Sequence, residues 1–194
     1  YNVFLLNYRV AANAHYPNPM EDLARAICFV KAHAAAFCVN AEKLVICGSS
    51  AGGHLCAYFA ARYGEFESLY HGKQYSLRPQ AVVLAYPVIS MTEETHEITR
   101  LRLLGLHPTR EEEKDKSVEL IAGKNYPPTF FWHCEGDRTV PISNSIRLDE
   151  KLTELSVRHV FKRYVRGGHG IGLARGTTAA GWFEDATEFL KEVL

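Results

Sequence analysis

The sequence predicts an α/β fold in which a mostly parallel sheet is flanked by helices. Short apolar runs alternate with helix-like segments along the chain, which is typical of a parallel sheet covered on both faces. The continuous apolar stretch Ala81–Tyr86 is typical of a central strand of such a sheet. A turn rich in glycine and serine, 48–52, joins the apolar run Lys43–Cys47 to the helix-like run Gly53–Ala61. The length of 194 residues fits one domain spanning residues 1–194.

The first helix is expected to begin at Pro17-Asn18-Pro19. Proline suits the first turn of a helix, where its missing N–H would have no partner in any case. Glu21 and Asp22 fall in that first turn, where negative charge favours the helix dipole. The apolar stripe of this helix, at helical spacing, comprises Leu23, Ala26, Ile27 and Val30.

Three further strands and a closing helix complete the expected elements. The chain opens with the apolar run Tyr1–Leu6, which is typical of a core strand. The aromatic-rich run Thr129–Cys134 and the alternating run His159–Tyr164 predict two more strands. Apolar residues from Trp182 to Val193 recur at helical spacing and predict a helix that docks on the sheet.

The most informative motif is the G-x-S-x-G pattern at 48–52. A strand, this pattern and then a helix form the context of a nucleophile elbow, a tight turn that exposes the serine above the sheet. The motif therefore indicates that Ser50 attacks a carbonyl carbon. An ordinary glycine-rich turn between a strand and a helix is the alternative interpretation.

A downstream acid and a downstream histidine favour the elbow. Asp137 follows a glycine at the end of the strand 129–134, and His169 lies among glycines after the strand 159–164. The order Ser, Asp, His matches that of α/β folds with a nucleophile elbow, and each residue follows a strand. The alternative interpretations are that Asp137 is an ordinary turn aspartate and that His169 is an ordinary histidine of a surface loop.

These motifs resemble the α/β-hydrolase superfamily along nearly the whole chain. The branch is that of small bacterial esterases similar to acetyl-xylan and other carbohydrate O-acetyl esterases and to hormone-sensitive-lipase-type carboxylesterases. The resemblance implies that Ser50 is the nucleophile, His169 the base and Asp137 the group that orients the histidine. We also expect the Ala51 N–H to bind the oxyanion and expect Ser49 and Val140 to contact substrate. The other matching motifs are Asn7–Val10, Ala85–Val88, Pro127–Thr129 and Gly167–Gly170.

One family feature is missing from the sequence. The superfamily carries an HGGG-type loop ahead of the Tyr-Arg strand, and that loop donates part of the oxyanion hole. No such loop precedes Tyr8-Arg9, so we expect an N-terminally truncated fold that lacks the first strands. By resemblance, an absent strand would lie between the first strand and the elbow strand. The first strand would then pair directly with the elbow strand, pair with another chain, or be poorly ordered.

A charged segment at about 89–124 interrupts the alternation of strands and helices. In the superfamily this position often carries a cap over the active site, so we expect a small cap-like insertion. Leu101, Leu103, Leu104 and Leu106 would then form an apolar patch facing the pocket. A pair of solvated helices without substrate contact is the alternative, and the run Glu111–Lys116 is typical of a solvated helix face.

Composition restricts the possible partners. The chain has 22 basic and 22 acidic residues, and this balance argues against a nucleic-acid binder. No apolar run approaches the length of a membrane span. The five cysteines form no C-x-x-C pair, and most of them are expected to be small core residues in a reducing, cytoplasmic compartment. We expect no cofactor and no metal site, and we expect His54 and His133 to be structural.

The sequence thus predicts a serine carboxylesterase that cleaves short acyl esters, with acetyl esters on carbohydrates as the family-based expectation. Two alternatives remain open: a peptidase of the prolyl-oligopeptidase type, and an inactive fragment or binding module. The expected partners are a small-molecule ester and a second copy of the chain, the latter through the exposed N-terminal strand.

Overall fold

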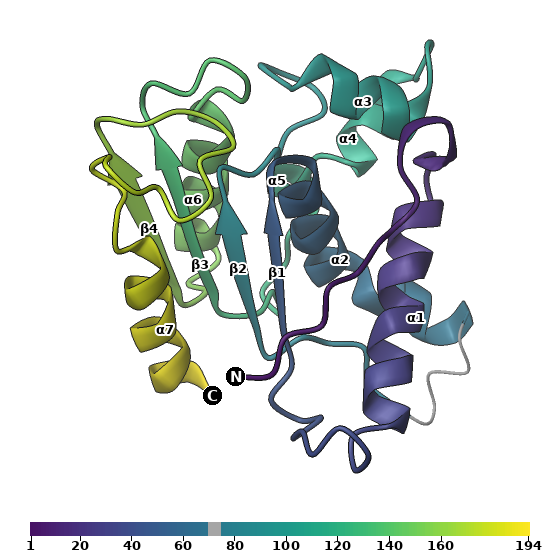
Figure 1. Ribbon diagram of the computed structural model, residues 1–194. Helices are drawn as coiled ribbons and strands as arrows, with labels where there is room; N and C mark the ends of the chain where they lie inside the picture. Colours follow the sequence, from purple (N-terminus) through teal and green to yellow (C-terminus); the bar gives the residue numbers. More distant parts are fainter. Residues whose placement is uncertain (70–74) are drawn as a thin grey trace.

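The computed structural model describes residues 1–69 and 75–194, and its centre is a parallel sheet of four strands. The strands follow one another across the sheet in the order β1-β2-β3-β4 (Figure 1). Their bounds are β1 Val45–Ser49, β2 Ala81–Ala85, β3 Thr129–Cys134 and β4 His159–Tyr164. Ser49 pairs with Ala85, and Ala85 pairs with Trp132, so the carboxyl ends of the strands meet at one edge. The predicted parallel α/β sheet is confirmed.

Helices cover both faces of this sheet. They are the 3-10 helix η1 Ala11–Asn13, α1 Asn18–Ala32, α2 Ser50–Leu69, α3 Glu97–Leu104, α4 Arg110–Asp115, α5 Val118–Ile121, α6 Ser143–Glu154 and α7 Trp182–Val193. Along β2, Val82 and Leu84 join the core that contains α1, α2 and α6, whereas Val83 joins the core under α7. This alternation explains why β2 is buried throughout and apolar throughout.

The expected first strand is not a strand. Residues 1–10, the N-terminal segment, are extended but belong to no strand of the sheet, so β1 forms one edge (Figure 1). Side chains hold the segment instead, because no neighbouring strand offers backbone partners. Arg9 donates to both carboxylate oxygens of Asp22 in α1, and the Phe4 ring lies 5.1 Å from that of Phe37. Direct pairing with the elbow strand, one of the three expected outcomes, is therefore wrong.

The segment 89–124 combines both expected arrangements. Helix α4 has no buried residue and is the solvated helix that its charges predict, whereas Val118 at the start of α5 is fully buried in the core. Helix α3 borders a pocket, as a cap would. The expected leucine patch is wrong in part, because Leu103 lines the pocket whereas Leu106 is 78% exposed.

The expectation that most cysteines are core residues is also wrong. All five are free, and only Cys56 and Cys134 are buried. Cys47 lies on β1, the edge strand of the described sheet, and is exposed.

Candidate active site

The turn between β1 and α2 has the geometry of a nucleophile elbow. Ser50 follows the last residue of β1 directly and opens α2. Its φ of +54° lies in the left-handed region, which non-glycine residues rarely adopt and which functional turns often contain. A Cβ at Gly48 would lie 2.1 Å from the carbonyl oxygen of Gly52, and a Cβ at Gly53 would lie 2.8 Å from Pro87. The tight turn therefore requires glycine at 48 and 53.

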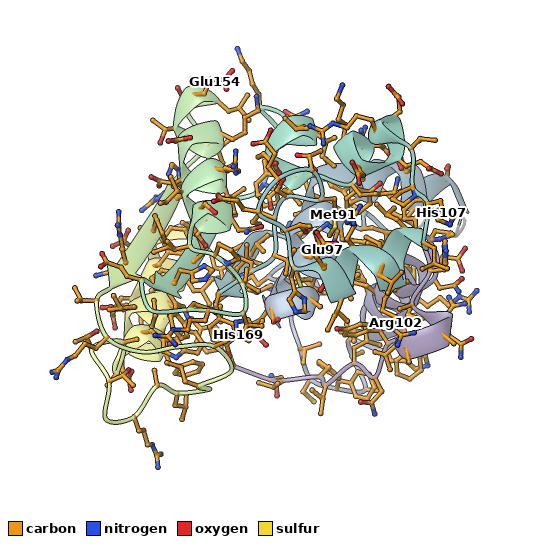
Figure 2. The ribbon with its side chains drawn as sticks, turned by 90° about the horizontal axis from the view of Figure 1, so that it is seen from above. Met91, Glu97, Arg102, His107, Glu154 and His169 are labelled. Atoms are coloured by element: carbon orange, nitrogen blue, oxygen red, sulfur yellow. The ribbon has the colours of Figure 1, made fainter. Side chains whose placement is uncertain are left out.

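Ser50, His169 and Asp137 form a chain of hydrogen bonds at the carboxyl edge of the sheet. The Ser50 hydroxyl lies 2.8 Å from Nε2 of His169. Nδ1 of the same ring lies 2.7 Å from Oδ2 of Asp137. With its proton on Nδ1, the imidazole donates to the carboxylate and accepts from the hydroxyl. Figure 2 looks down on this edge, with His169 labelled.

Asp137 is held as a carboxylate by an enclosed set of donors. Oδ1 accepts hydrogen bonds from the backbone N–H groups of Thr139 and Val140, and Oδ2 lies 3.2 Å from Nε2 of His133. Burial alone would raise the pKa of Asp137, but the hydrogen bonds from His133, Val140, His169 and Thr139 outweigh it. The pKa of Asp137 is therefore held well below its usual value, and the carboxylate is charged whenever His169 can act as a base.

Two residues around this triad have contacts with it that the sequence interpretation did not predict. The buried His133 ring accepts from or donates to Ser145 Oγ at 2.8 Å through Nδ1, and its Nε2 also lies 3.0 Å from the Val140 carbonyl oxygen. His133 is structural, as expected, but it also supports the acid. Tyr86 packs its ring 4.8 Å from the ring of His169. The position of Tyr86 at the carboxyl end of β2 is the signal that could have identified it.

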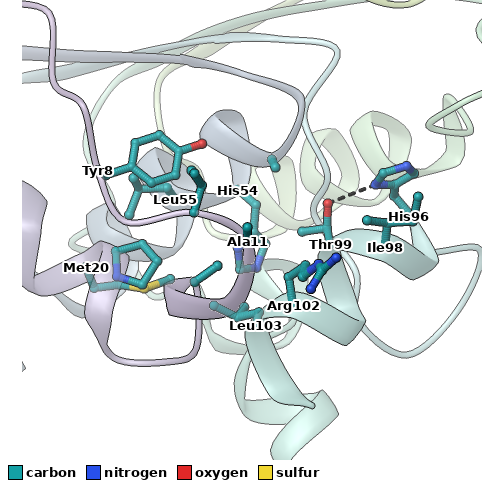
Figure 3. Close-up of a pocket in the computed structure, with 14 residues that line it drawn as sticks. Tyr8, Ala11, Met20, His54, Leu55, His96, Ile98, Thr99, Arg102 and Leu103 are labelled. Carbon is teal, nitrogen blue, oxygen red and sulfur yellow. Dashed lines mark hydrogen bonds between the residues drawn. The ribbon is translucent and has the colours of Figure 1, made fainter. Parts of the chain in front are cut away.

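A largely apolar pocket of about 210 Å³ opens beside the elbow, between α1, α2 and α3 (Figure 3). It is lined by Tyr8, Val10, Ala11, Ala14, Pro19, Met20, Ala51, His54, Leu55, His96, Ile98, Thr99, Arg102 and Leu103. Ala51, the residue that follows Ser50, is one of these lining residues, so the pocket reaches the elbow.

Two histidines in the pocket wall are held by hydrogen bonds. Nε2 of His54 lies 2.8 Å from the Lys116 carbonyl oxygen, and burial lowers the pKa of His54 to about 4. Nδ1 of His96 lies 2.9 Å from the Thr99 hydroxyl, as drawn in Figure 3. Burial, followed by the nearby His169, lowers the pKa of His96. His54 is therefore uncharged at neutral pH and, as expected, packed.

The other predicted site residues have different surroundings. Ala51 is exposed in the first turn of α2 and lines the pocket, and an N–H in the first turn of a helix has no partner within the helix. The predicted substrate contact of Val140 is wrong, because its side chain is 0% exposed and its backbone serves Asp137 and His133. Ser49 is exposed at the end of β1 and does not line the pocket.

Residues 1–69 and 75–194 contain no cluster of three or more potential metal ligands and no helix long and apolar enough to cross a membrane.

A family model matches most of the chain. The BD-FAE model matches residues 1–152, which include the elbow and Asp137. The chain belongs to the BD-FAE family. Solved structures agree on the α/β-hydrolase fold of this BD-FAE chain. An acetyl ester-xyloside bifunctional hydrolase from Caldicellulosiruptor lactoaceticus superposes with a TM-score of 0.87 at 29% identity, covering 96% of this chain and 70% of its own. The carboxylesterase Cest-2923 from Lactobacillus plantarum gives a TM-score of 0.80 at 25% identity, with 96% and 72% covered.

Curated relatives carry xylan-related and esterase names. Endo-1,4-beta-xylanase B of Butyrivibrio fibrisolvens is 34% identical over 93% of this chain, and an acetylxylan esterase of Xylanibacter ruminicola is 26% identical over 98%. This chain spans only 29% and 37% of those two proteins.

Proposed function

We propose that this BD-FAE chain is a carboxylic ester hydrolase that acts through an acyl-enzyme on Ser50. The observation that carries the proposal is the unbroken hydrogen-bond chain from Ser50 through His169 to Asp137. A serine is a weak nucleophile unless an adjacent base takes its proton, and the base must be oriented by a third group. The names of the relatives, which include an acetylxylan esterase and a probable carboxylic ester hydrolase of Mycobacterium tuberculosis, support the same chemistry.

The proposed reaction has two steps. The Ser50 oxygen attacks the ester carbonyl while His169 Nε2 takes the hydroxyl proton, and that proton then passes to the departing alcohol. Water next attacks the acyl-enzyme, again with His169 as the base, and releases the acid. Asp137 keeps the proton of the neutral ring on Nδ1 and stabilises the imidazolium formed in each step.

The developing oxyanion requires hydrogen-bond donors. The Ala51 N–H, in the first turn of α2, is the donor that we assign, and the positive end of the helix dipole adds to it. We assign no second donor among the described residues, and one such donor typically contributes a factor of about 10²–10³ to the rate. We therefore expect activated esters with good leaving groups to be the substrates most easily detected.

Short acyl esters, with acetylated carbohydrates as the first class to try, are the proposed substrates. The support for this class comes from the names of the relatives, one an acetylxylan esterase and another an acetyl ester-xyloside hydrolase. No geometric feature of the described residues favours the peptidase alternative. The cytoplasmic location likewise stays a prediction.

The test compares 4-nitrophenyl acetate hydrolysis by the wild-type chain, Ser50→Ala and the matched control Ser68→Ala. Ser68 lies in the same helix as Ser50, is exposed, and only donates to the carbonyl of Glu65. We expect Ser50→Ala to lose the enzymatic rate and Ser68→Ala to keep it. Equal rates for wild type and Ser50→Ala would leave only the inactive-module alternative. Faster cleavage of aminoacyl 4-nitroanilides than of acetyl esters would favour a peptidase.

A further inference from the structure

The pocket beside the elbow contains a cation that pairs with no carboxylate of residues 1–69 and 75–194. Arg102 projects from α3 and lines the pocket (Figure 3). Within residues 1–69 and 75–194, no salt bridge or hydrogen bond involves its side chain. Its neighbour on the same helix, Arg100, pairs with both Glu97 and Glu113. The acidic residues near α3 are therefore already engaged, and Arg102 remains available to a ligand.

The other polar groups of the pocket do not neutralise Arg102. The ring of His54 is uncharged and bound to a backbone carbonyl, and His96 bonds to Thr99. No Asp or Glu is among the lining residues. A group that fills this pocket thus meets apolar walls along most of its surface and one guanidinium at the side of α3.

Three more arginines around the triad lack an acidic partner in the described part of the chain. Arg138 follows Asp137 directly, and Arg166 and Arg175 flank His169 in the loops beyond β4. Most other arginines form ion pairs, among them Arg9, Arg25, Arg62, Arg110, Arg147, Arg158 and Arg163. Unpaired cations of this kind attract anionic ligands to their surroundings.

From these observations we propose that the substrate is an ester that carries a carboxylate, and that Arg102 binds this carboxylate while its apolar part fills the pocket. Guanidinium groups suit this role because they present paired donors to a planar carboxylate. The proposal rests on the esterase function proposed above and narrows its substrate class. Two sources of the charge are compatible with it, an acyl group ending in a carboxylate and an acetylated alcohol such as a uronic acid.

The first experiment measures kcat/KM for two matched pairs of esters. One pair places the charge on the acyl side, with mono(4-nitrophenyl) adipate against 4-nitrophenyl hexanoate. The other places it on the alcohol side, with an acetylated methyl glucuronoside against the corresponding acetylated methyl glucoside. An exposed ion pair supports a preference of up to about 5-fold for the charged ester, and screening should shrink it between about 0.02 M and 0.5 M salt.

Variants identify the cation. Arg102→Met keeps most of the side-chain length without charge and should abolish the preference, whereas Arg102→Lys should keep part of it. Arg78→Met is the matched control, because Arg78 is half-buried, precedes β2 at the opposite edge of the sheet, and its guanidinium bonds, among the described residues, only to the Asn125 carbonyl oxygen. Arg78→Met should leave the preference unchanged.

A binding measurement separates this proposal from the esterase function. Monomethyl adipate, which carries one carboxylate, and the uncharged methyl hexanoate are titrated against Ser50→Ala, and against Ser50→Ala combined with Arg102→Met, by NMR. We expect monomethyl adipate to bind more tightly only where Arg102 is present. If this holds while wild type cleaves no ester, the esterase function fails and the anion site stands. Equal binding of both compounds to Ser50→Ala, or an ester preference that survives Arg102→Met, would overturn the proposal.

Discussion

Alanine at position 48 should damage the elbow far more than alanine at position 52, although both glycines belong to the G-x-S-x-G motif. A Cβ at Gly48 would lie 2.1 Å from the carbonyl oxygen of Gly52, 2.5 Å from its carbonyl carbon and 2.9 Å from Sγ of Cys56. Two of these atoms are backbone of α2, so rotating a side chain cannot relieve the overlap. The first turn of α2 must move away from β1 by about 1 Å, and close packing makes such shifts costly.

The magnitudes follow from those distances. Overpacking typically costs 1–3 kcal/mol, and a backbone overlap belongs at the upper end, so Gly48→Ala should lower the free energy of unfolding by about 3 kcal/mol. For a chain of this length that corresponds to a fall in Tm of about 6–12 °C. A Cβ at Gly52 would meet only the Tyr8 hydroxyl, at an ordinary contact distance of 3.5 Å. Since alanine favours a helix over glycine, Gly52→Ala should raise stability by up to about 1 kcal/mol.

The assay is differential scanning calorimetry of wild type, Gly48→Ala and Gly52→Ala, with 4-nitrophenyl acetate turnover on the same samples. A shift of about 1 Å in the first turn of α2 also displaces Ser50 and the Ala51 N–H, so Gly48→Ala should lose about 100-fold in kcat. A Gly48→Ala protein with the wild-type Tm, or a Gly52→Ala protein that falls as far, would refute this description of the turn.

Further predictions concern the acid, its support and the N-terminal segment. Asp137→Asn should lower kcat by about 10⁴, because the amide favours the wrong histidine tautomer, and steady-state kinetics will check this. Since the folded pKa of Asp137 is depressed, its contribution to stability is present above the usual carboxyl pKa of 3.8 and is lost as the pH falls. Acid titrations of unfolding should therefore be steeper for wild type than for Asp137→Asn. His133→Phe should lower the free energy of unfolding by about 2 kcal/mol or more in urea denaturation, because it leaves buried partners such as Ser145 Oγ unpaired. We also propose that the exposed side chains Val3 and Leu5 support self-association. Sedimentation should then show less dimer for Leu5→Lys, and no change would contradict this.

Local patterns predicted most of the fold because they depend on burial within single elements. The bounds of β3 and β4 agree with the predicted runs, since aromatic and alternating residues mark strands that are covered by helices. Strand β1 ends two residues later than its apolar run, at Ser49, because the ladder with β2 continues through small residues. The N-terminal segment has the composition of a strand, but a strand also needs a neighbour in the sheet, which sequence alone does not supply.

The candidate site was predictable where chemistry depends on residue type and order. Ser50, Asp137 and His169 were identified because each follows a strand, and parallel strands bring their carboxyl ends together. The contact of His133 with Asp137 was not predicted, because it depends on how the chain folds after the strand. The unpaired state of Arg102 was not predicted either, because it depends on which residues lie around it in space. The assignment of Val140 to the substrate was wrong because the sequence does not reveal which way a side chain points, and that of Val140 points into the core.

The most direct test of the central claim is covalent labelling of the serine by a fluorophosphonate, followed by intact mass and peptide mapping. This reaction depends on a serine activated by a histidine and does not require complete turnover. We predict one adduct per chain, located on Ser50, and its loss in both Ser50→Ala and His169→Ala. An unlabelled wild-type chain, or an adduct that persists in Ser50→Ala, would contradict the assignment of Ser50 as the nucleophile.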